Sequence, residues 1–175
     1  MTVAYHLAVC LLLCLVQTTL PAFAGPGGGY DLMAPLVVYL GVYRVPKQAI
    51  PVLLVGGLTM DGLSGGVFGI HLTSYLWLYI GVRWAIQFLH VDNVVLLTLL
   101  VTIGIAFESL VMAFCAVVVS SAPWPVEAVF PIVSRQVFWG ALTGPILMVG
   151  FIRGHAAVLR AGNALFSEKD SLRSP

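Results

Sequence analysis

Ionisable residues that interrupt long apolar stretches are the first candidates for chemistry in this chain of 175 residues. Glu108 is the clearest case, because it lies about midway along an apolar run from Val94 to Ser120. A charged side chain inside a membrane is costly, so such a residue is a site hypothesis by default. Glu108 could relay protons or pair with a helix of another protein. Alternatively, it could be a carboxyl that the bundle itself satisfies or holds protonated.

A glycine-rich segment from Gly56 to His71 carries the second group of candidates. Asp61 could bind a ligand or partner at a membrane face, or it could be a helix cap or turn residue. Asp followed by Gly is a strong turn signal, and Ser64 can cap the helix that follows. For His71, hydrogen-bonded packing is the favoured interpretation and ligand binding the alternative.

Other signals for catalysis or metal binding are missing from the sequence. It contains no H-E-x-x-H, G-x-S-x-G or P-loop motif, and no carboxylate pair that would supply an acid and a base within one helical turn. Cys10, Cys14 and Cys115 lie in apolar sequence and are interpreted as small hydrophobic residues. We therefore expect no enzyme activity, no cofactor and no metal site.

Composition indicates the class of protein that must position these residues. The chain is 60% hydrophobic and 9% charged, with a mean hydropathy of +1.03. These values are far from those of soluble domains and indicate an integral membrane protein. The apolar stretches are unbroken rather than alternating, which favours helices over a barrel. A net charge of +1 excludes electrostatic nucleic-acid binding.

The apolar pattern predicts an all-α bundle of about six transmembrane helices in one domain, residues 1–160, followed by a short, frayed cytoplasmic tail, residues 161–175. The second and third spans are short, so they thin the bilayer, extend into their flanks or pack as a shielded hairpin. The six predicted spans are Val3–Leu20, Tyr30–Tyr43, Ala49–Met60, Phe68–Leu89, Val94–Ser120 and Ile132–Ile152.

Basic residues predict the orientation of the bundle. With both termini in the cytoplasm, all Lys and Arg residues except Arg135 lie on the cytoplasmic side, as the positive-inside rule requires. The first span also resembles a secretory signal, with an apolar run at Leu7–Val16 and an A-x-A site at Ala22–Ala24. Its amino-terminal region lacks Lys and Arg, which favours a retained span over a cleaved signal.

Glycines spaced four residues apart are expected to bring helices close together in lipid. Pro145 is expected to kink the sixth span. The glycine pairs are Gly65 and Gly69, Gly140 and Gly144, and Gly150 and Gly154.

The glycine-rich segment resembles the MreD family, the rod shape-determining membrane proteins of bacteria. The family pattern has a Gly-Leu pair, an aspartate and a glycine-rich turn that leads into the next helix. The stretch Asp31–Tyr39 is also similar to the second span of the family. The residues that match the pattern are Gly57, Leu58, Asp61, Gly65, Gly66 and Gly69.

The resemblance implies a non-enzymatic subunit of the cell-wall elongation machinery in the bacterial inner membrane. Its expected partners are an MreC-like protein and, through it, the glycosyltransferase and transpeptidase of the complex and MreB filaments. The implied fold is similar to the substrate-binding subunits of energy-coupling-factor transporters. That kinship supplies the alternative, a vitamin or metal uptake subunit, for which Ala4 and Ala8 have the A-x-x-x-A spacing of a docking helix.

Overall fold

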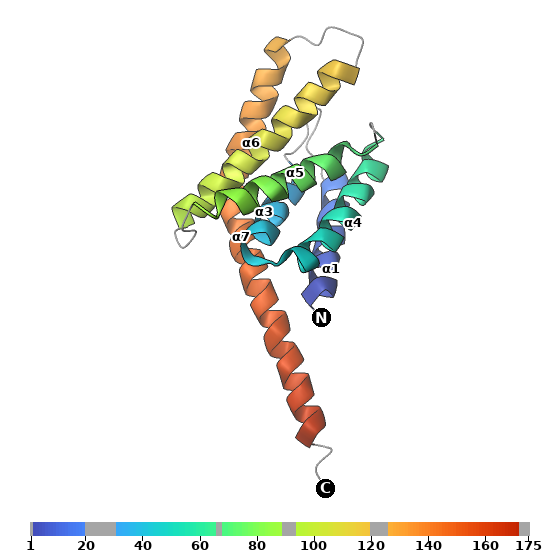
Figure 1. Cartoon of the computed structure of the whole chain (residues 1–175), viewed down its shortest axis with the longest axis vertical. Helices are drawn as coiled ribbons and strands as arrows, with labels where there is room; N and C mark the ends of the chain where they lie inside the picture. The colour runs from blue at the N-terminus through green and yellow to red at the C-terminus, as the bar shows by residue number, and fades with distance from the viewer. Residues whose placement is uncertain (1, 20–30, 66–67, 89–93, 120–125, 172–175) are drawn as a thin grey trace.

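The computed structural model of the chain describes residues 2–19, 31–65, 68–88, 94–119 and 126–171, and every regular element within them is an α-helix. The predicted all-α class is therefore confirmed. In Figure 1, α1 begins and α7 ends towards the lower side of the view. The helices are α1 (Thr2–Thr19), α3 (Met33–Tyr43), α4 (Pro46–Ser64), α5 (Ile70–Ala85), α6 (Val94–Val119) and α7 (Val126–Ser171).

Three of these helices are long and apolar enough to cross a membrane. They are α1, the Leu96–Cys115 part of α6 and the Val133–Arg160 part of α7. By contrast, α3 has 11 residues and α5 has 16. At 1.5 Å per residue these helices are about 16 and 24 Å long, less than the roughly 30 Å of a hydrocarbon core. The described helices therefore support a membrane protein. Three of them, rather than the predicted six, are long and apolar enough to span the membrane.

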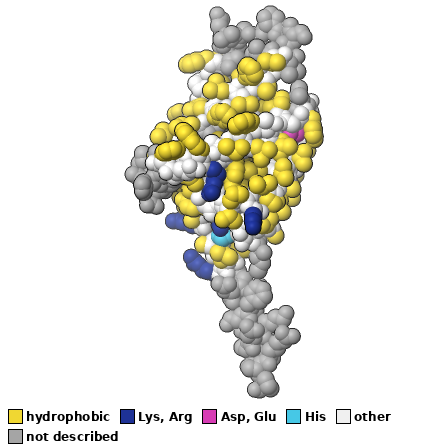
Figure 2. Space-filling view, viewed as in Figure 1, with side chains coloured by type: hydrophobic (Ala, Val, Ile, Leu, Met, Phe, Trp, Pro, Cys, Tyr) yellow, Lys and Arg dark blue, Asp and Glu magenta, His cyan; other side chains and the backbone are white. Residues whose placement is uncertain are grey.

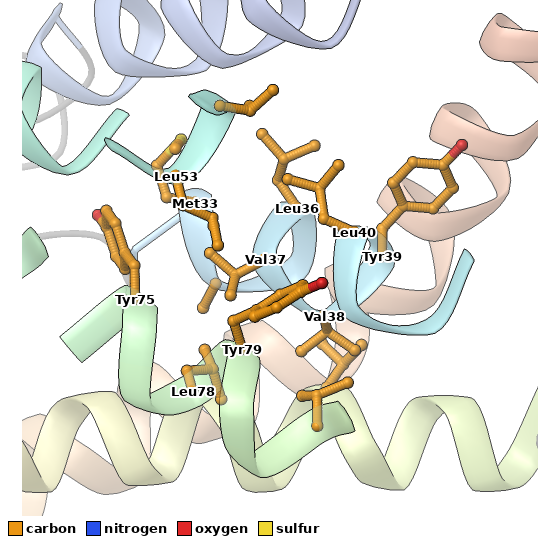
Figure 3. Close-up of a cluster of buried hydrophobic side chains, with 14 of the residues drawn as sticks. Met33, Leu36, Val37, Val38, Tyr39, Leu40, Leu53, Tyr75, Leu78 and Tyr79 are labelled. Carbon is orange, nitrogen blue, oxygen red and sulfur yellow. The ribbon is translucent and has the colours of Figure 1, made fainter. Parts of the chain in front are cut away.

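The short helix α3 forms the centre of the molecule. Every residue from Met33 to Gly41 is buried, and α3 contacts all five other described helices. Figure 3 shows its side chains between those of α4 and α5. A helix that is apolar all round is expected to be enclosed by other helices. Because its neighbours shield it from lipid, α3 need not match the thickness of the bilayer.

Several helix boundaries differ from the predicted ones, and two of the differences change where a candidate residue or segment lies. Helix α4 extends to Ser64, so Asp61 lies in its last turn rather than after its end. Helix α7 continues to Ser171 instead of ending near Ile152, so the predicted frayed tail is helical over residues 161–171. Pro145 lies inside α7, and Figure 1 shows the upper and lower parts of this helix running in different directions, as an internal proline produces.

The outer surface of the bundle is strongly apolar. Large hydrophobic side chains are exposed on several helices, among them Leu15, Trp84, Phe114 and Ile146. Figure 2 shows hydrophobic side chains over most of one face, with the Lys and Arg side chains on its lower half. A soluble monomer rarely exposes so much contiguous apolar surface, whereas lipid covers it in a membrane.

Candidate functional site

Asp61 caps the first turn of α5 from the neighbouring helix. Its Oδ1 accepts hydrogen bonds from the backbone N–H of His71 at 2.9 Å and from the His71 ring at 3.1 Å, and its Oδ2 accepts one from the Leu72 N–H at 3.3 Å. The first N–H groups of a helix have no partner inside it. The Asp61 side chain is fully buried, so its carboxylate takes the place of water there and ties α4 to α5.

Ser64 does not cap α5, contrary to the expectation from sequence. Its hydroxyl instead donates to the Asp61 carbonyl at the end of α4. The N-cap position of α5 is Gly69, which has no side chain to accept a bond. Asp61 supplies the missing acceptor from ten residues upstream of His71.

The glycines of this turn serve backbone conformation rather than helix packing. Gly65 and Gly69 have φ angles of 63° and 97°, a left-handed region that glycine adopts without penalty. A Cβ at either position would meet nothing within 4 Å, so these two glycines are not points of close helix contact among the described residues. Gly66 lies outside the described residues.

Gly57 is a close-packing glycine that the spacing argument did not select. A Cβ at this position would lie 2.6 Å from the Cα of Leu72, so the backbones of α4 and α5 approach closely there. Leu72 is also one of the residues capped by Asp61. Gly57 and Asp61, four residues apart, therefore lie against the same turn of α5.

Glu108 lies in a sealed position on α6. It is 3% exposed, and no N–H or O–H donor of the described residues bonds to either of its carboxyl oxygens. The charged group that acts on it is the carboxyl of Asp31, at the start of α3. Glu108 thus faces a second acidic group rather than a counter-charge.

Asp31 connects Glu108 to the rest of the bundle. Its Oδ1 accepts the N–H of Met33 at 2.7 Å, and its Oδ2 accepts the Tyr75 hydroxyl. Tyr75 is fully buried on α5 and interacts electrostatically with both Asp31 and Glu108. One polar cluster, the Asp31–Tyr75–Glu108 cluster, therefore joins α3, α5 and α6.

A second polar cluster surrounds the other end of α3. The buried rings of His6 and His155, from α1 and α7, stack with centroids 5.3 Å apart. His6 also stacks on Tyr39 at 5.7 Å, and the Tyr39 hydroxyl accepts a 2.8 Å hydrogen bond from Arg44. Because the Thr2 carbonyl can only accept, the 2.6 Å contact places a proton on His6 Nδ1. The sequence around His6 and His155 contains no pattern that predicts this contact between α1 and α7.

The glycines of α7 differ in what they contact. A Cβ at Gly140 or Gly144 would lie within 2.6 Å of Ile105 or Val101 on α6, and a Cβ at Gly154 would lie 2.3 Å from the Tyr5 hydroxyl. Gly150 has open space around its Cβ position. Three of the four predicted packing glycines are therefore points of close approach within the molecule, and Gly150 is not.

We expect Gly144→Ala to lower stability, because the new methyl group meets the stiff β-branched Val101. Overpacking of this kind costs about 1–3 kcal/mol. Gly150→Ala is the matched control on the same helix, and it should be neutral or slightly stabilising. Thermal unfolding in detergent checks the pair, and equal melting temperatures would contradict the close α6–α7 contact.

The cysteines form no disulfide in the part of the chain that the structure describes. Cys10 and Cys14 are buried free thiols and Cys115 is half-buried and free. Among the described residues, no group of three or more His, Cys, Asp or Glu side chains could hold a metal ion.

Comparisons of the chain with models of known families, with curated proteins and with solved structures found no match.

Proposed function

We propose that this protein is a non-enzymatic scaffold subunit of the bacterial cell-wall elongation complex, of the MreD type. It would act in the inner membrane by binding an MreC-like partner and, through that partner, the peptidoglycan-synthesising enzymes and MreB filaments. Both termini would lie in the cytoplasm.

The observation that carries this proposal is that residues on which the resemblance rests act together on the first turn of α5. Asp61 caps His71 and Leu72, Gly57 packs on the backbone of Leu72, and Gly69 turns the chain between them. A chance match to a glycine-rich pattern would not require its members to act on one turn of the next helix. Here they form one unit, the α4–α5 hairpin.

The apolar exterior also fits a subunit that works through contacts inside the membrane. Exposed side chains such as Leu12, Ile103 and Phe138 are suited to lipid or to helices of a partner. In hydrocarbon, helices associate through packing and hydrogen bonds rather than through a hydrophobic driving force.

Depletion of the protein in a rod-shaped host tests the proposal. We expect cells to become round as lateral wall synthesis loses its scaffold, and a plasmid copy of the wild-type gene should restore the rods. Cell width measured by microscopy is the readout. Normal rods after full depletion would contradict the proposal.

The uptake alternative has one observation in its favour, because Ala4 and Ala8 are both exposed on α1. A small-residue pair on an outer face could dock a transporter module. Depletion would then abolish uptake of a vitamin or metal without changing cell shape. Measuring tracer uptake and cell width in the same culture separates the two functions.

A further inference from the structure

The starting point is the absence of a positive partner around Glu108. Helices α3, α5 and α7 pack against α6. Of these, α3 presents Asp31 at its start and α5 presents Tyr75. On α7, Gln136 is neutral and already accepts the Ser109 hydroxyl at 2.8 Å. Among the described residues, the charged group that acts on the buried Glu108 side chain is thus the acidic Asp31.

We propose that Glu108 and Asp31 form a proton-binding site, in which Glu108 carries the proton and donates it in a hydrogen bond to Asp31. An unpaired carboxylate buried in a low-dielectric bundle is very costly, and two adjacent carboxylates cannot both ionise cheaply. A proton removes one charge and turns Glu108 into a donor, so a repulsive pair becomes a hydrogen-bonded one.

The other contacts explain why the charge rests on Asp31. Its carboxylate already accepts the Met33 N–H and the Tyr75 hydroxyl, and it lies near the positive end of the α3 dipole. Glu108 has no such donors. The proton thus lies on Glu108, the carboxyl group that has no hydrogen-bond donors to stabilise a negative charge. The resulting hydrogen bond links α6 to the start of α3, which Tyr75 on α5 also contacts through Asp31.

A proton fits this site better than a metal cation does. Calcium and magnesium need about six or more oxygen ligands, and zinc needs about four ligands. The described residues provide no cluster of three metal-ligating side chains. A proton needs neither a ligand shell nor an empty volume. The site does not depend on the identity of the partner proposed above.

Infrared spectroscopy of the full chain in lipid bilayers at neutral pH tests the proposal. Glu108, Glu127 and Glu168 are the only glutamates in the sequence. In the double variant Glu127→Gln/Glu168→Gln, Glu108 is the one remaining glutamate. When this variant is made with ¹³C-labelled glutamate, the isotope therefore labels the carboxyl group of Glu108 alone. We expect the label to lower the frequency of the C=O stretching band of a protonated carboxylic acid. In the otherwise wild-type chain, Glu108→Gln should remove this band.

Two comparisons make the test decisive. Asp31→Asn should shift the acid band, because the acceptor changes from a carboxylate to an amide. Asp61→Asn is the matched control and should leave the acid band intact. Label found only in carboxylate bands would overturn the proposal, as would conversion of the acid band to carboxylate when sodium replaces a bulky organic cation. The isotope-labelling experiment keeps Glu108 in place. It therefore tests the proposal even when the Glu108→Gln variant does not fold.

Discussion

Replacing Asp61 with alanine is expected to produce one of the two largest losses of stability of any single substitution discussed for this chain. The carboxylate accepts two backbone N–H groups at the start of α5 and the ring of His71. Without it these part-buried donors lose their acceptor. A fully buried orphan costs about 1–3 kcal/mol, and water can reach these donors in part, so we expect a total loss of about 2–4 kcal/mol. Thermal unfolding followed by size-exclusion chromatography in detergent measures it.

Asp61→Asn is the matched control for this loss. The amide keeps one oxygen that can accept a backbone N–H, so its effect should be clearly smaller than that of alanine. His71→Ala should also be milder, because the two backbone bonds remain. If Asp61→Ala melts at the wild-type temperature, Asp61 does not hold the α4–α5 hairpin.

Gly57→Val is expected to separate α4 from α5. The new Cβ would lie 2.6 Å from the Leu72 Cα, and a backbone atom cannot move aside as the end of a side chain can. Overpacking costs about 1–3 kcal/mol and occasionally more, and this position belongs at the upper end. We expect a lower melting temperature and a smaller yield of folded protein from membranes.

Gly62→Val on the same helix controls for the change in helix propensity, which is slightly favourable when valine replaces glycine. A Cβ at Gly62 meets nothing within 4 Å, so only the small change in propensity remains. If the two substitutions lower the melting temperature equally, the close Gly57–Leu72 contact does not contribute to the stability of the hairpin. Restoration of Gly57→Val by a smaller residue at Leu72 is not expected, since the clash is with backbone.

Apolar runs predicted the presence and order of the helices well. Val94–Ser120 became α6 (Val94–Val119) and Val3–Leu20 became α1 (Thr2–Thr19), each within one residue at both ends. The ends of α4 and α7 were missed because hydropathy marks the lipid-compatible part of a helix. Polar residues such as Asp61, or those after Arg160, can continue the same hydrogen-bonded helix beyond that part.

The candidate site was less predictable than the helices. Glu108 and Asp61 are conspicuous in apolar sequence, and both are buried. Their partners are not conspicuous, because Tyr75 lies 44 residues after Asp31 in the chain and His6 meets His155 across the bundle. Such pairs depend on how α3 is enclosed by the other helices. Spacing along one helix carries no information about that arrangement.

Crosslinking in native membranes tests the proposed scaffold function most directly. A photoreactive residue on an exposed, apolar position of the wild-type chain should capture an MreC-like protein, identified by mass spectrometry. Asp61→Ala, which loosens the hairpin, should reduce the yield relative to Asp61→Asn. Capture of a transporter ATPase module or of its membrane subunit, with no MreC-like protein from any exposed position, would contradict the account.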